Sequence, residues 1–257
     1  MTDKARVGFY GITGCAGCLL SVIFNEDEIL DIAGAVDIVA FPFIKGENDH
    51  EGPLDIVFIE GTVVSTDDEA MVKKLRQRSK IVVALGSCAC VGNIPAIKQY
   101  VPSENWNSLE YDKNIQNQCR EGGPVPLHKV IPVEFSIPGC PPDRDEIKTF
   151  IKEVLMGMTF RNYKDPVCIE CKLYENGCLL DEGEVCLGPI TAGGCHAICT
   201  TKGLKCYGCR GLTDDANLTA YFDLMAEKGI SKEDTIKTME IFMAIDVHEA
   251  LKKEGLE

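Results

Sequence analysis

Short runs of almost entirely apolar residues alternate with amphipathic stretches over roughly the first 155 residues of the chain. Runs such as DIVFIE and KIVVALG have the composition of strands that are covered on both faces. The strand-like runs are Arg6–Tyr10, Val36–Phe41, Asp55–Glu60, Lys80–Leu85 and Val130–Ile137. Because strands that alternate with helices pair in parallel, the pattern predicts an α/β domain with a doubly wound parallel sheet.

The amphipathic stretches between these runs predict three helices. Apolar residues recur near helical spacing over Leu19–Ala33, and another helix is expected over Asp143–Met156, after two prolines. Between them, Thr66 and Glu69 form a capping box for a helix that ends near Arg78. The alternating pattern ends at about residue 160, so we predict a first domain over residues 1–160.

The rest of the chain, residues 161–257, has a different pattern. Residues 166–212 contain eight cysteines, many glycines and few long apolar runs, so this segment cannot bury enough apolar surface to fold alone. Two helical stretches follow, at about 216–228 and 232–252, and Ser231 is the predicted N-cap of the second. The apolar face of this last helix comprises Ile236, Met239, Met243, Val247 and Leu251. We therefore predict a cysteine-rich second domain with C-terminal helices and an inorganic core.

Composition limits the possible functions. With a formal net charge of −14 and no run of Lys or Arg, the chain is not expected to bind nucleic acid or anionic membranes, and the charge suits docking on other proteins. No segment approaches the roughly 18 consecutive apolar residues of a membrane span. The amino terminus has neither an apolar signal region nor a twin arginine. We therefore predict a cytoplasmic protein without a transmembrane segment.

Fourteen cysteines are more than a chain of 257 residues ordinarily needs for packing. Because the cytoplasm is reducing, metal binding explains them better than disulfides. Four of them, Cys15, Cys18, Cys88 and Cys140, follow predicted strands next to glycine or proline. In an open parallel sheet such loops meet at the carboxyl edge, so these thiols are expected to converge. Four thiolates suit zinc or a 4Fe–4S cluster, and buried structural cysteine is the simpler alternative.

The cysteine-rich segment contains two runs of four cysteines, each with one CxxC pair, at opposite ends. The first run is Cys168, Cys171, Cys178 and Cys186, and the second is Cys195, Cys199, Cys206 and Cys209. A zinc ribbon would leave four cysteines over, whereas two iron–sulfur clusters use all eight. In two-cluster ferredoxins the fourth cysteine of each run crosses to the other cluster. That rule predicts that Cys209 joins the first run and Cys186 the second.

Three other candidate ligands are assigned no metal. His196 adjoins Cys195, but with eight cysteines available it is expected to form a hydrogen bond or to face solvent. Cys90 is too close to Cys88 to need a separate site. Cys119 lies in the polar stretch NIQNQCREGG. We therefore predict that twelve of the fourteen cysteines bind metal.

Taken together, the cysteine motifs resemble one protein family. GCAGC, GSCACVG and PGCPP are similar to the proximal-cluster signature of the small subunit of nickel–iron hydrogenases. PVCIECKL, CLGPITAGGCHAIC and CYGCRG resemble the carboxyl-terminal cluster segment of the cytoplasmic, multimeric class. That class includes the archaeal sulfhydrogenase delta subunit and the small subunits of the coenzyme F420-reducing and heterodisulfide-reductase-linked enzymes. The resemblance covers roughly residues 5–215.

This resemblance implies a flavodoxin-like first domain, a ferredoxin-like two-cluster segment and three 4Fe–4S clusters in a chain. Cys15, Cys18, Cys88 and Cys140 would hold the proximal cluster, and the eight later cysteines would hold the medial and distal clusters. In this family another group, sometimes acidic, can replace a proximal ligand, which makes Glu60 at the end of the third strand a residue to check. The nickel–iron centre would lie in a separate large subunit, so no catalytic residue is expected in this chain.

The implied function is electron transfer, within a hydrogenase, between the nickel–iron large subunit and a further acceptor subunit that contains flavin or iron–sulfur. One alternative is a stand-alone ferredoxin-like carrier, although a carrier does not need so large a first domain. Another is a zinc-stabilised interaction module. The 20 kDa subunit of respiratory complex I shares the proximal fold but has adjacent paired cysteines and lacks the eight-cysteine tail. NADP, F420, ferredoxin and heterodisulfide are all open as terminal acceptors, as are the reaction direction and the oligomeric state.

Overall fold

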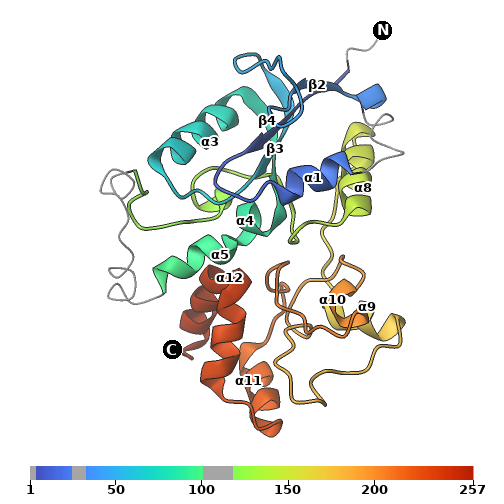
Figure 1. Cartoon of the computed structure of the whole chain (residues 1–257), viewed down its shortest axis with the longest axis vertical. Helices are drawn as coiled ribbons and strands as arrows, with labels where there is room; N and C mark the ends of the chain where they lie inside the picture. The colour runs from blue at the N-terminus through green and yellow to red at the C-terminus, as the bar shows by residue number, and fades with distance from the viewer. Residues whose placement is uncertain (1–3, 25–32, 101–117, 257) are drawn as a thin grey trace. The chain divides into compact units, whose positions relative to one another are not determined.

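The computed structural model describes residues 4–24, 33–100 and 118–256 (Figure 1). The chain divides into two compact units, Met1–Arg161 and Asn162–Glu257. Each unit has a hydrophobic core of its own, and the first has two, one on each face of its sheet. Within the described ranges, no helix has both the length and the apolar character that a bilayer crossing requires.

The first unit is built on a five-stranded sheet whose strands all pair in parallel. The strands are β1 (Arg6–Gly11), β2 (Asp37–Ala40), β3 (Leu54–Glu60), β4 (Ser79–Leu85) and β5 (Phe135–Ile137). Their spatial order, β2-β1-β3-β4-β5, is that of a flavodoxin-like doubly wound fold. The predicted fold class is therefore confirmed. The connections reverse direction between β1 and β3, and this class of fold gathers its functional loops at that point.

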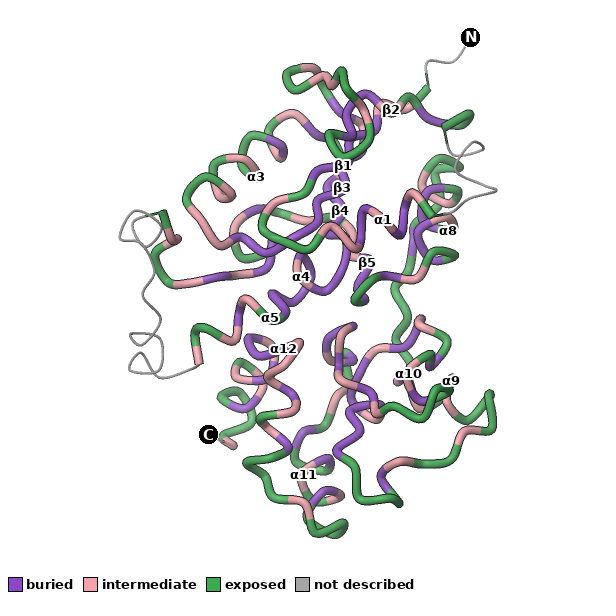
Figure 2. The backbone as a smooth tube through the Cα atoms, viewed as in Figure 1, coloured by how far each residue is buried: buried purple, intermediate pink, exposed green. Residues whose placement is uncertain are grey.

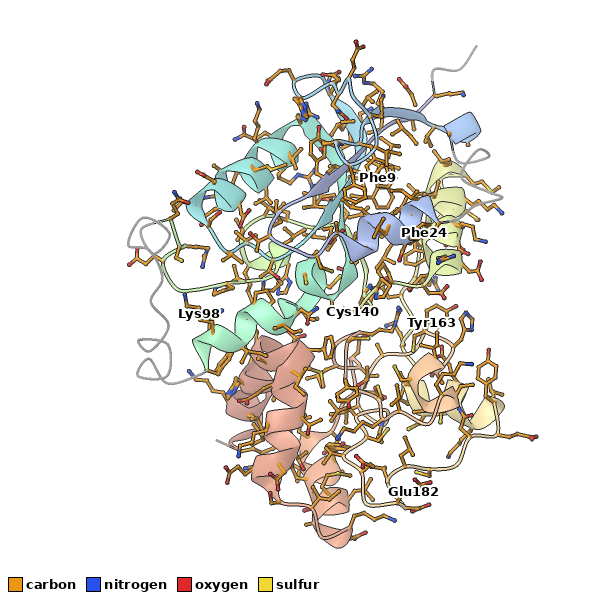
Figure 3. The ribbon with its side chains drawn as sticks, in the orientation of Figure 1. Phe9, Phe24, Lys98, Cys140, Tyr163 and Glu182 are labelled. Carbon is orange, nitrogen blue, oxygen red and sulfur yellow. The ribbon has the colours of Figure 1, made fainter. Side chains whose placement is uncertain are left out.

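Helices cover both faces of this sheet (Figure 1). One face carries α1 (Gly17–Ile23) and α8 (Arg144–Leu155), and the other carries α3 (Thr66–Arg78), α4 (Gly86–Val91) and the 3-10 helix η2 (Leu127–Lys129). Successive side chains of β1 point to opposite faces of the sheet and so pack in different cores. Phe9 packs with α1 and α8, and Tyr10 packs with α3. The Phe9 ring stacks on Phe58 with 4.7 Å between their centroids. Phe9 is labelled in Figure 3. The strands form a largely buried layer (Figure 2).

Several elements differ from the sequence prediction. Helix α1 ends at Ile23, and residues 25–32 of the predicted helix lie outside the described residues. The fifth strand has three residues rather than eight, because a 3-10 helix precedes it and Pro132 has no N–H for a ladder. Two short helices after β4 were not predicted, α4 and α5 (Asn93–Ala96), and the 3-10 turn η1 (Ile97–Gln99) follows them.

The predicted capping box is present one residue earlier than expected. Ser65, rather than Thr66, is the N-cap of α3, and its Oγ accepts a hydrogen bond from Asp68 N at 3.0 Å. In return, Asp68 Oδ2 accepts a hydrogen bond from Ser65 N at 3.0 Å. Asp68 therefore replaces Glu69 in the box, because a carboxylate at the third helical position reaches back to the N-cap amide whether it is Asp or Glu.

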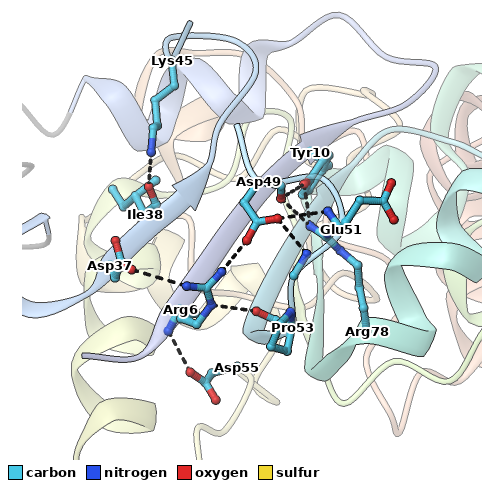
Figure 4. Close-up of polar contacts among 11 residues, drawn as sticks. Arg6, Tyr10, Asp37, Ile38, Lys45, Asp49, Glu51, Pro53, Asp55 and Arg78 are labelled. Carbon is cyan, nitrogen blue, oxygen red and sulfur yellow. Dashed lines mark hydrogen bonds and ion pairs between the residues drawn. The ribbon is translucent and has the colours of Figure 1, made fainter. Parts of the chain in front are cut away.

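A network of charged residues ties the amino-terminal edge of the sheet to the loop before β3 (Figure 4). Arg6 pairs with Asp49 at 2.5 Å and donates from Nε to the Pro53 carbonyl at 2.9 Å. Arg78, at the end of α3, donates to the Tyr10 hydroxyl at 2.8 Å and to the Asp49 carbonyl at 3.0 Å. Ion pairs and hydrogen bonds between side chains and backbone therefore connect the elements at this edge of the sheet. The cysteines follow the strands at the opposite, carboxyl edge.

The second unit combines a loop-rich cysteine segment with two longer helices. Its helices are α9 (Val167–Leu173), α10 (Ile198–Thr201), α11 (Leu218–Glu227) and α12 (Lys232–Glu254). Ser231 caps α12 as predicted, and its Oγ accepts from Asp234 N at 3.0 Å. On the predicted apolar face, Met239, Met243, Val247 and Leu251 are buried, and Ile236 packs partly buried against the same core. Leu187 and Cys186 of the cysteine segment share this core, so α11 and α12 supply much of its apolar cover.

Candidate metal centres

Four cysteines of the first unit come together at the carboxyl edge of the sheet. Cys15 lies in the loop after β1 and Cys18 in the first turn of α1, while Cys88 lies in α4 after β4. Cys140, labelled in Figure 3, follows β5. Burial is the largest cause that raises the pKa of Cys18, and nearby Glu60, Cys88, Cys140 and Cys15 raise it further. These residues therefore lie within electrostatic reach of one another. We call Cys15, Cys18, Cys88 and Cys140 the first quartet.

The glycines beside the first quartet allow this close approach. Gly86 adopts a left-handed φ of 84°, and a Cβ built on it would overlap the Cys18 sulfur. Gly139 has φ 133°, and its carbonyl accepts a hydrogen bond from Ser87 N at 2.9 Å. That bond joins the first turn of α4 to the loop after β5. Glycine is thus needed at these turns for backbone conformation and for space around sulfur.

Burial also shapes the chemistry of these thiols. Cys18 is buried and Cys88 half-buried, whereas Cys15 and Cys140 are exposed. Burial raises the pKa of Cys18, Cys88 and Cys140 above that of an ordinary thiol. Without a cation these three thiols therefore stay protonated, and a positively charged metal centre would stabilise their thiolates. The donor set fits a metal that binds four sulfurs, as zinc and a 4Fe–4S cluster both do.

Glu60 lies at the end of β3, beside the first quartet, and only 3% of its surface is exposed. Its Oε2 accepts a hydrogen bond from Leu19 N at 2.9 Å, and the N–H groups of Ala16 and Cys18 also donate to the carboxylate. Desolvation raises the pKa of Glu60, and these backbone hydrogen bonds oppose that shift. The carboxylate therefore holds the segment from Ala16 to Leu19, which contains Cys18 and follows Cys15 directly. Its contact with a cluster stays a prediction.

Sequence reasoning missed one residue at this edge, Asn93. Its Nδ2 lies 3.3 Å from Cys88 Sγ and 3.8 Å from Cys140 Sγ. For both thiols, burial raises the pKa most, and the hydrogen bond from Asn93 opposes this. The available signal was the Gly-Asn pair that follows the cysteines in GSCACVGN, since both residues suit a left-handed turn.

In the second unit, the first run of cysteines gathers around α9. Cys168 and Cys171 lie on this helix, and burial, followed by Cys186, Cys171 and Cys178, raises the pKa of Cys168 to about 11. A Cβ at Gly188 would lie 3.2 Å from Cys168 Sγ and 3.7 Å from Cys186 Sγ. Cys186 therefore lies close to Cys168 of its own run. The crossed grouping predicted from ferredoxins stays a prediction.

The second run of cysteines lies close to Cys186 as well. Cys206 N donates a hydrogen bond to Cys186 Sγ at 3.3 Å. Burial raises the pKa of Cys206 most, and Cys209 and Cys186 raise it further. Burial also raises the pKa of Cys199, with Cys186 as the next cause. Cys186 therefore lies between the two runs, and Cys206 lies close to Cys209.

Glu170 is a second residue that sequence reasoning missed, and it connects the two runs. It lies on α9 between Cys168 and Cys171, and its carboxylate accepts from Gly194 N at 2.5 Å and from Ala197 N at 3.1 Å. Glu170 Oε2 also lies 3.8 Å from Cys195 Sγ. The Glu170 carboxylate, which lies among the cysteines of the first run, therefore fixes the loop that contains Cys195 of the second run. A lone Glu between two cysteines gives no sequence signal for this role.

The residues predicted to be nonligands lie as follows. His196 is exposed in a left-handed conformation with φ 55°. Cys90 is buried in the core beside α3, where its thiol donates to the Ala84 carbonyl at 3.4 Å. Cys119 is half-buried and forms an isolated β-bridge with Ser65. Their exclusion from metal binding stays a prediction.

Comparison with known proteins places this arrangement in a family. The family model for the 20 kDa subunit of NADH–ubiquinone oxidoreductase matches residues 15–154, more than half of the chain, and so includes all four cysteines of the first quartet. The chain is 33% identical over 227 residues to the delta subunit of sulfhydrogenase 2 from Pyrococcus furiosus, covering 86% of this chain and 92% of that protein. It is 31% identical over 245 residues to a subunit of the F420-non-reducing hydrogenase from Methanococcus voltae, covering 84% and 85% respectively.

A solved structure gives the same result. A chain of the NAD+-reducing [NiFe]-hydrogenase in its H2-reduced state matches with a TM-score of 0.53 and 27% identity, covering 61% of this chain and 94% of that one. The resemblance drawn from the cysteine motifs is therefore confirmed. The chain belongs to the family of the 20 kDa subunit of NADH–ubiquinone oxidoreductase and, within it, to the small subunits of hydrogenases.

Proposed function

We propose that this chain is the electron-transfer subunit of a nickel–iron hydrogenase. It passes electrons between the nickel–iron site of a large partner subunit and an acceptor subunit, through three 4Fe–4S clusters bound by twelve of its fourteen cysteines. The observation that carries this proposal is the convergence of Cys15, Cys18, Cys88 and Cys140, which follow three different strands, at one edge of the sheet. The two cysteine runs of the second unit provide the other two sites.

The surroundings of the thiols support iron–sulfur clusters. A 4Fe–4S cluster, when bound, supplies the positive iron that thiolates need and takes up or releases one electron. The chain contributes N–H donors toward sulfur, from Asn93 in the first unit and from Cys206 in the second. It also contributes apolar cover, such as Leu187 beside Cys186 and Cys206, which keeps water away. Such donors and such burial are the means by which proteins tune these centres.

The other parts of the enzyme are assigned to partner subunits. Because twelve cysteines are committed to the proposed clusters, the hydrogen-activating site lies in the large subunit. Cys15 and Cys140 are exposed, which supports electron exchange with a partner at the first quartet. A further acceptor subunit with flavin or iron–sulfur, and a cytoplasmic location, follow from the sequence analysis and stay predictions.

Metal and sulfide analysis of the anaerobically purified chain tests this proposal. Three 4Fe–4S clusters require about twelve iron and about twelve sulfide per chain. Visible absorbance near 400 nm should bleach with dithionite. Stoichiometric zinc, or about four iron per chain, would contradict the three-cluster assignment.

A second candidate is an iron–sulfur carrier of the ferredoxin or complex-I type, without a hydrogenase partner. The family model favours it as far as residues 15–154 are concerned. The match to hydrogenase subunits over most of the chain and the eight cysteines of the second unit favour the hydrogenase. Affinity purification from the native source separates the two, since recovery of a nickel-containing large subunit supports the hydrogenase and its absence supports the carrier.

A further inference from the structure

One polar side chain, that of Asn93, reaches two sulfurs of the first quartet. Its Nδ2 lies 3.3 Å from Cys88 Sγ and 3.8 Å from Cys140 Sγ. Cys88 lies in α4, directly after β4, and Cys140 follows β5, so one amide group bridges thiols from two separate segments. An NH2 group has two hydrogens, which is the number needed to donate to both sulfurs.

The orientation of this amide is set by a second contact. Asn93 Oδ1 accepts a hydrogen bond from Ile94 N at 2.6 Å. Because the oxygen is used there, the NH2 group faces the sulfurs. The residue is buried, with 3% of its surface exposed, so water competes little for these donors.

The backbone at Asn93 is also specific. Gly92 and Asn93 are successive left-handed residues, with φ of 88° and 49°, and they turn the chain sharply after α4. Asn is among the few residues other than glycine that adopt this conformation readily. The buried Thr62 hydroxyl fixes the turn by donating to the Gly92 carbonyl at 2.9 Å and contacting the Cys88 carbonyl at 3.3 Å.

We propose that Asn93 is a positioning residue that raises the reduction potential of the cluster at the first quartet. This inference rests on the proposed function, in which the quartet binds a 4Fe–4S cluster. Reduction adds one electron and no proton, so the negative charge on the cluster and its cysteine sulfurs increases. N–H groups that donate to these sulfurs stabilise the reduced form more than the oxidised form. The cluster of the first quartet, whose ligands Cys15 and Cys140 are exposed, thereby becomes a better electron acceptor.

The test is a redox titration of the full chain, monitored by electron paramagnetic resonance, on two substitutions. Asn93→Gly removes both donors, suits φ 49° and adds no charge. Asn93→Asp keeps the acceptor for Ile94 N but replaces the donors with a carboxylate. The signal of the first quartet is identified as the one lost in Cys88→Ser. The matched control is Asn217→Asp, because Asn217 N-caps α11 through an oxygen acceptor, and Asp caps equally well.

We expect Asn93→Gly to lower the ratio of reduced to oxidised cluster about tenfold at a fixed potential, as the loss of a hydrogen bond to a charged group implies. For a one-electron couple this is about 59 mV. Asn93→Asp should lower the ratio further, because it adds a negative charge. Asn217→Asp should leave this signal at its wild-type potential.

Iron analysis of each protein separates the two levels of the hypothesis. Wild-type chain without a cluster at this quartet would contradict the proposed function itself. Full iron content with an unchanged potential in Asn93→Gly would overturn the role of Asn93 alone. Loss of the cluster from both Asn93 variants would also overturn it, because the residue would then be needed to build the site rather than to set its potential.

Discussion

At the scale of single residues, the first quartet depends on what stands beside each cysteine. Gly86 is the clearest case, because its φ of 84° and the space beside it are both required. A Cβ there would overlap the sulfur of Cys18, which is itself buried between α1 and the sheet and cannot move outward easily. The site therefore constrains a residue that binds no metal.

This constraint predicts that Gly86→Ala removes the cluster of the first quartet. Two effects destabilise the variant. The left-handed backbone costs an L-residue roughly 1–2 kcal/mol. The new Cβ would also overlap Cys18 Sγ. Gly183→Ala separates them, since Gly183 has the same φ of 84° but no atom within 4 Å of its Cβ position. Iron analysis should show about four fewer iron in Gly86→Ala and full iron in Gly183→Ala. Full iron content in both would show that the Cys18 loop can move.

The cysteines of the candidate site could be predicted from the sequence, whereas the residues that support them could not. A thiol after a strand in a parallel sheet has few ordinary uses, so Cys15, Cys18, Cys88 and Cys140 stood out. Asn93 and Glu170 are common polar residues whose roles depend on where their side chains point. A left-handed turn directs Asn93 toward sulfur, and α9 places Glu170 next to the loop of the second run. Neither direction can be read from residue spacing.

At the scale of elements, the seven-residue helix α9 has two structural roles. It presents Cys168 and Cys171, and through Glu170 it fixes the loop from Gly194 to Ala197. That loop contains two successive non-glycine residues with positive φ, His196 at 55° and Ala197 at 48°. Such backbone persists only when its surroundings hold it, and here the Glu170 carboxylate accepts the N–H groups at both ends of the loop.

Glu170→Ala should therefore loosen the loop that presents Cys195. It leaves two N–H groups without their acceptor, at about 1–3 kcal/mol each where no water replaces it. We expect the cluster that uses Cys195 to be lost, which removes about four iron per chain. The cluster of the first quartet should remain bound. Glu182→Ala, at an exposed position of the same unit (Figure 3), removes an equal charge and should keep all iron. Equal iron in the two variants would show that the loop is held by other contacts.

Helices and strands were predicted accurately where local sequence determines them, and poorly where tertiary contacts do. Strands β1, β3 and β4 have continuous apolar runs and lie within one residue of prediction. The fifth strand was predicted too long, because apolar Val130 and Ile131 belong to the turn after η2 rather than to a ladder. Helix α4 was missed because its glycine and cysteines give no periodic pattern, and α5 because four residues are too few to show one. The turn between them is fixed by a tertiary contact, the hydrogen bond from Thr62 to the Gly92 carbonyl.

At the scale of the whole molecule, the two units are stabilised differently. The first has apolar cores on both faces of its sheet, with Phe9, Phe58 and Phe150 fully buried. In the second, Leu187 and its neighbours pack against α11 and α12, but the segment from Val167 to Arg210 is mostly loop. The cysteine-rich sequence predicts an inorganic core there. The structure adds that helices α11 and α12 contribute an apolar part of it.

This difference predicts an unequal response to removal of iron by a chelator under anaerobic conditions. Amides of β3 and β4 should stay protected from hydrogen–deuterium exchange, because their bonds lie between two apolar layers that need no metal. Peptides from residues 167–210 should lose protection, since without bound clusters this segment holds its cysteine loops together only through short turns and the apolar residues it shares with α11 and α12. Reconstitution with iron and sulfide should restore protection in that segment. Equal loss in both units would mean that the first quartet's cluster is required for the sheet, and retained protection in both would mean that apolar contacts with α11 and α12 suffice for the cysteine segment.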